Sequence, residues 1–111
     1  MKKILIAEDD EEIRELFKRI LRNKYEVIEA RDGGEAVEKY KNYNPDLALI
    51  DIKMPVLRGD EVIKEIRSLD PKANIVAVTA YDFPEERLGV EVLRKGFGMR
   101  QLLDVVDKKL A

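Results

Sequence analysis

The stretch Pro45–Pro55, PDLALIDIKMP, decides how this chain folds. Its apolar run, Leu47 to Ile50, leads into the single carboxylate of Asp51, and a proline bounds the stretch on each side. A short apolar run between such breakers is typical of a strand buried on both faces of a parallel sheet. In an open α/β sheet, ligands bind outside the carboxyl ends of the strands, so the pattern places Asp51 at a candidate site.

Strand and helix patterns alternate on both sides of this stretch. The sequence predicts strands at 4–7, 26–30, 75–78 and 90–93, in addition to the central one. Between them lie amphipathic helical patterns; the first carries an apolar stripe at Ile13, Leu16, Phe17, Ile20 and Leu21, with Asp9 or Asp10 able to cap its start. Alternation with short connections predicts one α/β domain, residues 1–111, with a parallel sheet covered by helices on both faces.

The composition excludes several classes of chemistry. The chain has no cysteine and no histidine, which removes thiolate and Ser-His or Cys-His nucleophiles and leaves only oxygen ligands for a metal. A net charge of −2 gives no global attraction for nucleic acid, so we expect no direct nucleic-acid partner. The apolar segment at the start is about four residues, too short for a signal peptide or membrane span, and we expect a cytoplasmic protein.

Polar residues stand at the carboxyl ends of four predicted strands. Glu8 and Asp9 follow the first strand, Asp51 the third and Thr79 the fourth, and Lys95 follows the last. Right-handed crossovers bring these ends to one edge of the sheet. Taken singly, each residue has an ordinary structural explanation, such as a helix-capping carboxylate or a surface lysine. Five suitable residues at one edge outweigh those explanations.

This set of side chains suits phosphoryl chemistry around a magnesium ion. Crowded carboxylates repel one another unless a cation lies between them, and Mg²⁺ favours one or two carboxylates together with water and phosphate. A carboxylate beside Mg²⁺ can attack a phosphoryl group and form an aspartyl phosphate. The transferred group needs cationic and hydroxyl partners, which Lys95 and Thr79 can provide.

The chain resembles the CheY-like receiver domains of two-component response regulators from end to end. The resemblance is carried by Lys3–Asp9 (KILIAED), Pro45–Pro55, Gly59, Val78-Thr79-Ala80 and Lys95-Gly96-Phe97. It implies a flavodoxin-like, doubly wound sheet of five parallel strands in the order 2-1-3-4-5.

The resemblance also implies a role for each site residue. Asp51 would be the phosphoacceptor, and it would bind Mg²⁺ together with Glu8, Asp9 and the backbone carbonyl of Lys53. Thr79 would be the switch hydroxyl and Lys95 the lysine that pairs with the phosphate. The family's spacing to Ile13-Arg14 places the acidic pair at Glu8-Asp9 rather than at Asp9-Asp10.

The sequence departs from the family in four places. Gly96 replaces the usual proline after the lysine, so no cis peptide is expected there. Val92 replaces a common aromatic residue, and Arg58 replaces the acidic residue before Gly59. Most importantly, Tyr81–Arg94 is several residues shorter than its family counterpart. Since a crossover with its helix normally needs at least ~10–12 residues besides the strand, we expect the fourth helix to be truncated or missing.

With 111 residues there is no room for a fused DNA-binding domain, so we expect a stand-alone receiver without an effector domain. It would accept a phosphoryl group from the phosphohistidine of a sensor histidine kinase or phosphotransfer protein, and it would signal through a partner protein. We expect at most weak self-catalysed transfer and hydrolysis. A partner or a second copy of the chain, forming a homodimer, would cover the sheet beside Tyr81–Arg94.

Three other functions remain as alternatives. A degenerate receiver would bind proteins independently of phosphorylation, which the shortened segment favours and the acidic residues oppose. An aspartyl-phosphate hydrolase would need a general acid two residues after its nucleophile, where this chain has Lys53. A flavin-binding flavodoxin relative is disfavoured because the acidic run 8–12 would repel the phosphate of the cofactor.

Overall fold

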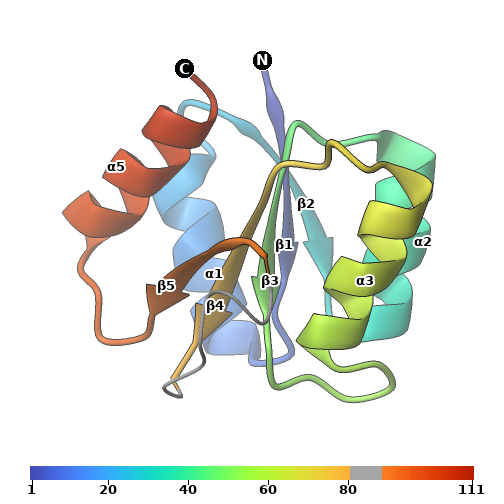
Figure 1. The fold of residues 1–111 in the computed structure, drawn as a ribbon. Coiled ribbons are helices and arrows are strands. Elements are labelled where there is room, and N and C mark those ends of the chain that lie inside the picture. The colour runs from blue at the N-terminus through green and yellow to red at the C-terminus, as the bar shows by residue number, and fades with distance from the viewer. Residues whose placement is uncertain (81–88) are drawn as a thin grey trace.

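The five strands form one parallel sheet in the order β2-β1-β3-β4-β5, as predicted. The computed structural model describes residues 1–80 and 89–111. Its elements follow one another along the chain as shown in Figure 1: β1 (Lys3–Ala7), α1 (Glu11–Leu21), β2 (Glu26–Ala30), α2 (Gly33–Tyr43), β3 (Leu47–Asp51), α3 (Gly59–Leu69), β4 (Ile75–Thr79), β5 (Glu91–Arg94) and α5 (Met99–Lys109).

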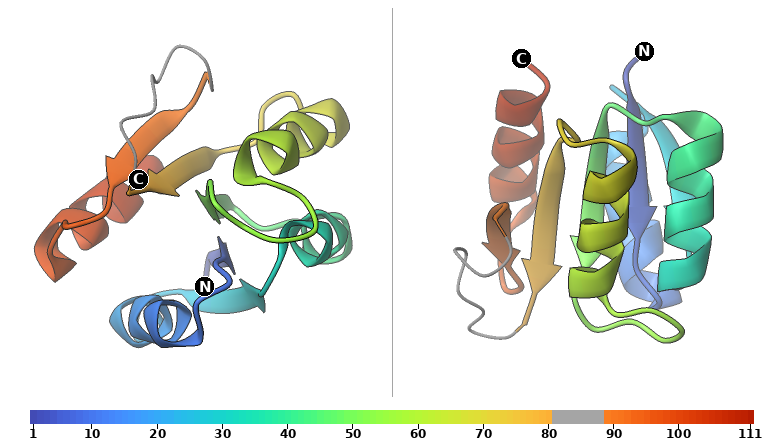
Figure 2. Two further views of the ribbon diagram at one scale, coloured as in Figure 1. Left: turned by 90° about the horizontal axis from the view of Figure 1, so that it is seen from below. Right: turned by 45° about the vertical axis from the view of Figure 1, so that its right-hand side comes forward.

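The helices cover both faces of the sheet. In Figure 2, α1 and α5 lie on one face, while α2 and α3 lie on the other. Alternate residues of the strands point to opposite faces, so Leu5 and Ile50 pack toward α2 and α3. Ile4 and Leu49 pack toward α1 and α5. The central strand β3 is buried along its whole length, which explains the continuous apolar run in its sequence.

Two details of the predicted elements are corrected by the structure. Leu16 was expected to belong to the buried stripe of α1, but its side chain is 53% exposed, and Arg14 is buried in its place. The last strand begins at Glu91 rather than Val90, because pairing with β4 starts at Val76–Glu91. The preceding Gly89 has a φ of 66°, a left-handed turn that glycine adopts without steric cost.

The predicted truncation of the fourth helix concerns residues 81–88, which lie outside the described residues. Within the ranges 1–80 and 89–111, no peptide bond is cis, including the one that joins Lys95 to Gly96. None of the described helices is long and apolar enough to span a membrane.

Candidate phosphoacceptor and metal site

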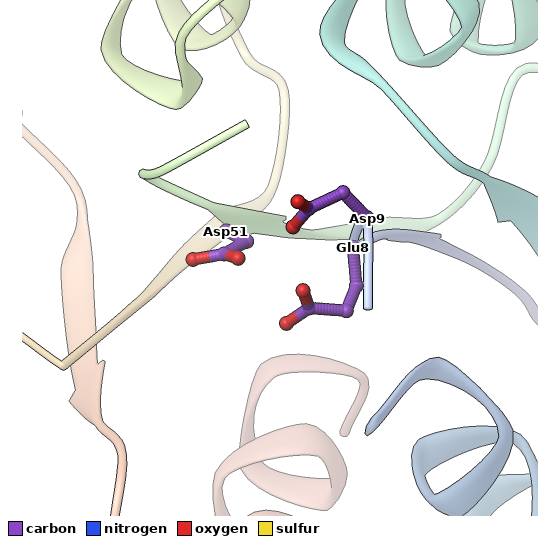
Figure 3. A group of neighbouring side chains, drawn as sticks. All are labelled: Glu8, Asp9 and Asp51. Carbon is purple, nitrogen blue, oxygen red and sulfur yellow. The ribbon is translucent and has the colours of Figure 1, made fainter. Parts of the chain in front are cut away.

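The carboxyl ends of the strands meet at the lower edge of the molecule in Figure 1. There the structure brings Glu8, Asp9 and Asp51 together: one carboxylate oxygen from each lies within 4.8 Å of the other two (Figure 3). Glu8 and Asp51 are 1% and 4% exposed, whereas Asp9 is exposed to solvent. This is the arrangement that the strand ends predicted, with two carboxylates from the end of β1 and one from the end of β3.

Glu8 and Asp9, and not Asp10, are the residues of the acidic run that are grouped with Asp51. Asp10 is the N-cap of α1, and its side chain accepts hydrogen bonds from the amides of Glu12 and Ile13. Capping satisfies amides that have no partner within the helix. The side chain of Asp10 is therefore committed to the helix, which leaves the two preceding residues for the site.

Asp51 is the last residue of β3, and the chain turns sharply after it. The amide of Lys53 donates to Asp51 Oδ1 at 3.4 Å, and the amide of Gly59 donates to the carbonyl of Ile52 at 2.8 Å. The loop 52–58 thus folds back against the strand end. Lys53 lies beside the carboxylate, where its carbonyl was expected to be a metal ligand; that role stays a prediction.

Lys95 bridges the two buried carboxylates. Its ammonium nitrogen lies 3.4 Å from Glu8 Oε1 and 3.4 Å from Asp51 Oδ2. Burial lowers the pKa of Lys95, but the charges of Asp51 and Glu8 outweigh burial and raise it above its ordinary value. Lys95 therefore carries its positive charge at neutral pH and faces the proposed phosphoacceptor.

Thr79 ends β4 next to this group. Its side chain is 1% exposed, and its backbone carbonyl accepts a hydrogen bond from the amide of Lys95 at 2.7 Å. In the register of β3 and β4, Asp51 lies opposite Val78, so Thr79 is one residue further toward the site. All five residues predicted at the strand ends are thus gathered at one edge.

The residues present fit a divalent cation. Burial, aided by the neighbouring Asp51, raises the pKa of Glu8 to about 8. Glu8 Oε1 is buried, lies 3.4 Å from the Lys95 ammonium and makes no hydrogen bond among the described residues. With all groups ionised, three carboxylates and one ammonium leave two negative charges, which Mg²⁺ would balance with the oxygen ligands it prefers.

A family model for the response regulator receiver domain matches residues 4–107. This chain is a receiver domain. The chemotaxis protein CheY of Bacillus subtilis is 34% identical to the domain in an alignment 118 residues long, gaps included, which covers 97% of each chain. A CheY-like receiver from Methanospirillum hungatei superposes with a TM-score of 0.93 at 33% identity, over 99% of this chain and 94% of that one.

A third relative was crystallised with ligands. The response regulator TrrA of Thermotoga maritima, in complex with Mg²⁺-BeF, has a TM-score of 0.90 and 37% identity to this receiver, covering 98% of this chain and 99% of its own. These similarities confirm the predicted family and its fold.

Sequence reasoning missed one residue of this region, Arg14. Its guanidinium contacts the loop that joins β1 to α1, residues 8–10, which we call the acidic loop. It donates to the carbonyl of Glu8 at 2.9 Å. A helical wheel contains the signal, because Arg14, Phe17 and Leu21 follow the spacing i, i+3 and i+7 of one helix face. The search for apolar residues alone selected Leu16 instead.

Proposed function

We propose that Asp51 accepts a phosphoryl group from the phosphohistidine of a sensor histidine kinase or phosphotransfer protein, in a reaction that requires Mg²⁺. The observation that carries this proposal is the position of the Asp51 carboxylate. Its Oδ2 lies 3.4 Å from the Lys95 ammonium, and it is grouped with the carboxylates of Glu8 and Asp9, whose oxygens lie within 4.8 Å. A nucleophile and the charges that phosphoryl transfer needs are thereby collected at one strand end.

In this reaction, a carboxylate oxygen of Asp51 attacks the phosphorus atom and forms the P–O bond of an acyl phosphate. The P–N bond to the donor imidazole breaks, and its electron pair remains on the imidazole, which takes up a proton. Lys95 pairs with one phosphoryl oxygen and the Thr79 hydroxyl donates to another. Mg²⁺, held by Glu8, Asp9, Asp51 and the Lys53 carbonyl, would neutralise negative charge on the transferring group.

The relatives support this proposal. The CheY proteins and TrrA share the fold, and TrrA was crystallised in complex with Mg²⁺-BeF. We further propose that the phosphorylated receiver passes its signal to a partner protein. That step distinguishes a switch from an enzyme whose purpose is turnover.

Mass spectrometry after incubation with acetyl phosphate tests the proposal. The intact protein should gain one phosphoryl group in the presence of Mg²⁺ and none when the metal is chelated. Asp51→Asn has nearly the same shape but lacks the nucleophilic carboxylate, so it should show no gain. Full labelling of Asp51→Asn would refute the assignment of the phosphoacceptor.

The same experiment separates this function from that of a degenerate receiver. The shortened connection between Thr79 and Lys95 favours the degenerate form, which would bind its partner without modification. Stoichiometric labelling of the wild-type protein excludes that alternative, whereas its complete absence, with Mg²⁺ present and the protein folded, would favour it.

A further inference from the structure

Arg14 is a buried charged residue that contacts the acidic loop. It lies in the first turns of α1, and its side chain is only 10% exposed. An arginine so removed from solvent requires polar partners, because burying an unpaired charge is costly. The identity of those partners indicates what the residue does.

One partner is the peptide bond that joins the two acidic residues. Arg14 Nη1 donates to the carbonyl oxygen of Glu8 at 2.9 Å, and this carbonyl belongs to the peptide between Glu8 and Asp9. The other partner is Glu29, near the end of β2, whose Oε1 lies 3.3 Å from Arg14 Nε. The guanidinium therefore ties the acidic loop to the neighbouring strand.

The rest of the loop is restrained on both sides of this peptide. The amide of Glu8 donates to the carbonyl of Ala30 at 3.1 Å, and Asp10 caps α1. Over residues 1–80 and 89–111, the Asp9 side chain makes no hydrogen bond or ion pair. The direction of the Asp9 carboxylate consequently depends on the backbone that carries it, and Arg14 fixes the peptide immediately before it.

We infer that Arg14 is a positioning residue that holds the Glu8-Asp9 peptide in the geometry needed for cation binding, and that Glu29 holds Arg14. This inference rests on the proposed function, since it concerns the Mg²⁺ site. Residues that orient metal ligands typically contribute 10–100-fold to metal affinity. Arg14 acts through the backbone of the ligands and does not touch the metal.

A purely electrostatic role for Arg14 predicts the opposite result. Removing a positive charge near a cation site should strengthen Mg²⁺ binding, because like charges repel. Loss of positioning should weaken it. The sign of the change in Mg²⁺ affinity therefore distinguishes the two roles. A role in stability alone would lower the melting temperature and leave the affinity of the folded protein unchanged.

The test is a Mg²⁺ titration of the full chain, followed through the NMR amide shifts of residues 8–10 and 51–53. Arg14→Met keeps most of the side-chain volume and should weaken Mg²⁺ binding about tenfold. Arg14→Lys keeps one donor for the Glu8 carbonyl, so its affinity should lie between those of Arg14→Met and wild type. The matched control is Arg19→Met on the same helix. Arg19 forms an exposed ion pair with Glu15, remote from the loop, so the Mg²⁺ affinity of Arg19→Met should match that of wild type.

Glu29→Gln tests the second half of the inference. It should weaken binding a few-fold in the wild-type background and have no further effect when combined with Arg14→Met, because Glu29 acts through Arg14. An equal effect in both backgrounds would overturn the assignment of Glu29.

Wild-type affinity, or tighter binding, in folded Arg14→Met would overturn the positioning role. If Arg14→Met does not fold, the other two variants decide, and wild-type affinity in both Arg14→Lys and Glu29→Gln overturns it equally. Failure of the wild-type protein to bind Mg²⁺ would instead refute the proposed function, and this inference with it.

Discussion

Gly59→Ala should destabilise the domain, although alanine is the better helix former. Gly59 begins α3 at the point where the chain passes the end of β3. A Cβ at this position would lie 2.2 Å from the carbonyl oxygen of Asp51 and 2.5 Å from Cα of Ile52. Both are backbone atoms, so no side-chain rotation can relieve the contact. Either the helix or the strand end that carries Asp51 must move.

The structure also indicates the size of the effect. Helix propensity alone would favour alanine by about 1 kcal/mol. Forcing extra volume into a packed site costs about 1–3 kcal/mol, and a backbone clash belongs at the upper end of that range. The shift would also strain the 2.8 Å hydrogen bond from the Gly59 amide to the Ile52 carbonyl. We therefore expect a net loss of about 2 kcal/mol in the free energy of unfolding, together with weaker Mg²⁺ binding.

Urea unfolding followed by circular dichroism measures this change, and Gly34→Ala is the matched control. Gly34 also lies in the first turn of a helix, but a Cβ there would meet side-chain atoms rather than backbone, Val56 Cγ1 at 3.3 Å and Asp32 Oδ1 at 3.4 Å. That valine is 82% exposed and can move aside, so Gly34→Ala should gain up to about 1 kcal/mol. If Gly59→Ala stabilises the protein as Gly34→Ala does, the steric argument is wrong.

Three further changes test the electrostatics and the backbone. Asp9→Ala should abolish Mg²⁺ binding. In metal-free buffer it should raise the free energy of unfolding by roughly 1 kcal/mol, because repulsion among the carboxylates is reduced, and the gain should be smaller at high salt. A lower melting temperature for this variant would contradict the repulsion among the carboxylates. Burial, aided by the hydrogen bond to Asp70, raises the pKa of Tyr40 to about 12 from an ordinary 10.0. The neutral Tyr40 hydroxyl therefore contributes to the free energy of unfolding in full below pH 10, and this contribution is lost as pH rises through 12. Between pH 10 and pH 12, Tyr40→Phe should therefore lose less stability than wild type in urea titrations. Equal losses in the two proteins would contradict the raised pKa of Tyr40. Val56→Gly should gain up to about 1 kcal/mol in the same assay, because Val56 has a φ of 70° and is exposed, so glycine relieves backbone strain without loss of packing; a loss would show that the strain is small.

The fold could be predicted because its signals are local. The run Leu47–Ile50 predicted the buried strand β3, which the structure extends by one residue to Asp51. The alternation of strands and helices predicted a parallel sheet, and parallel strands necessarily bring their carboxyl ends to one edge. For this reason the sequence alone could predict that Glu8, Asp9 and Asp51 would lie close together.

The burial of Arg14 could not be predicted in the same way. A hydrophobic stripe predicts buried residues from their apolarity, and this criterion selected Leu16. Arg14 is buried because the Glu8 carbonyl and the Glu29 carboxylate meet its guanidinium, and Glu29 comes from another strand. A charged residue on the inner face of a helix depends on such distant partners, which the local pattern does not contain.

The position of Lys95 is explained by strand pairing and does not depend on the length of the connection before it. The stretch between Thr79 and Lys95 is shorter than its family counterpart, so the path of the chain to Lys95 differs from the usual one. In the sheet, however, Thr79 lies opposite Arg94, and the Lys95 amide donates to the Thr79 carbonyl at 2.7 Å. Two adjacent strands thus determine where the lysine emerges, whatever path joins them.

The residue after Lys95 shows the same independence from the usual family pattern. Gly96 has a φ of 103°, which proline cannot adopt because its ring holds φ near −65°. The chain therefore leaves the site along a different backbone path from one that a proline would allow. The ammonium still lies 3.4 Å from both Glu8 and Asp51, because the pairing of β5 with β4 has already placed Lys95 before Gly96 is reached.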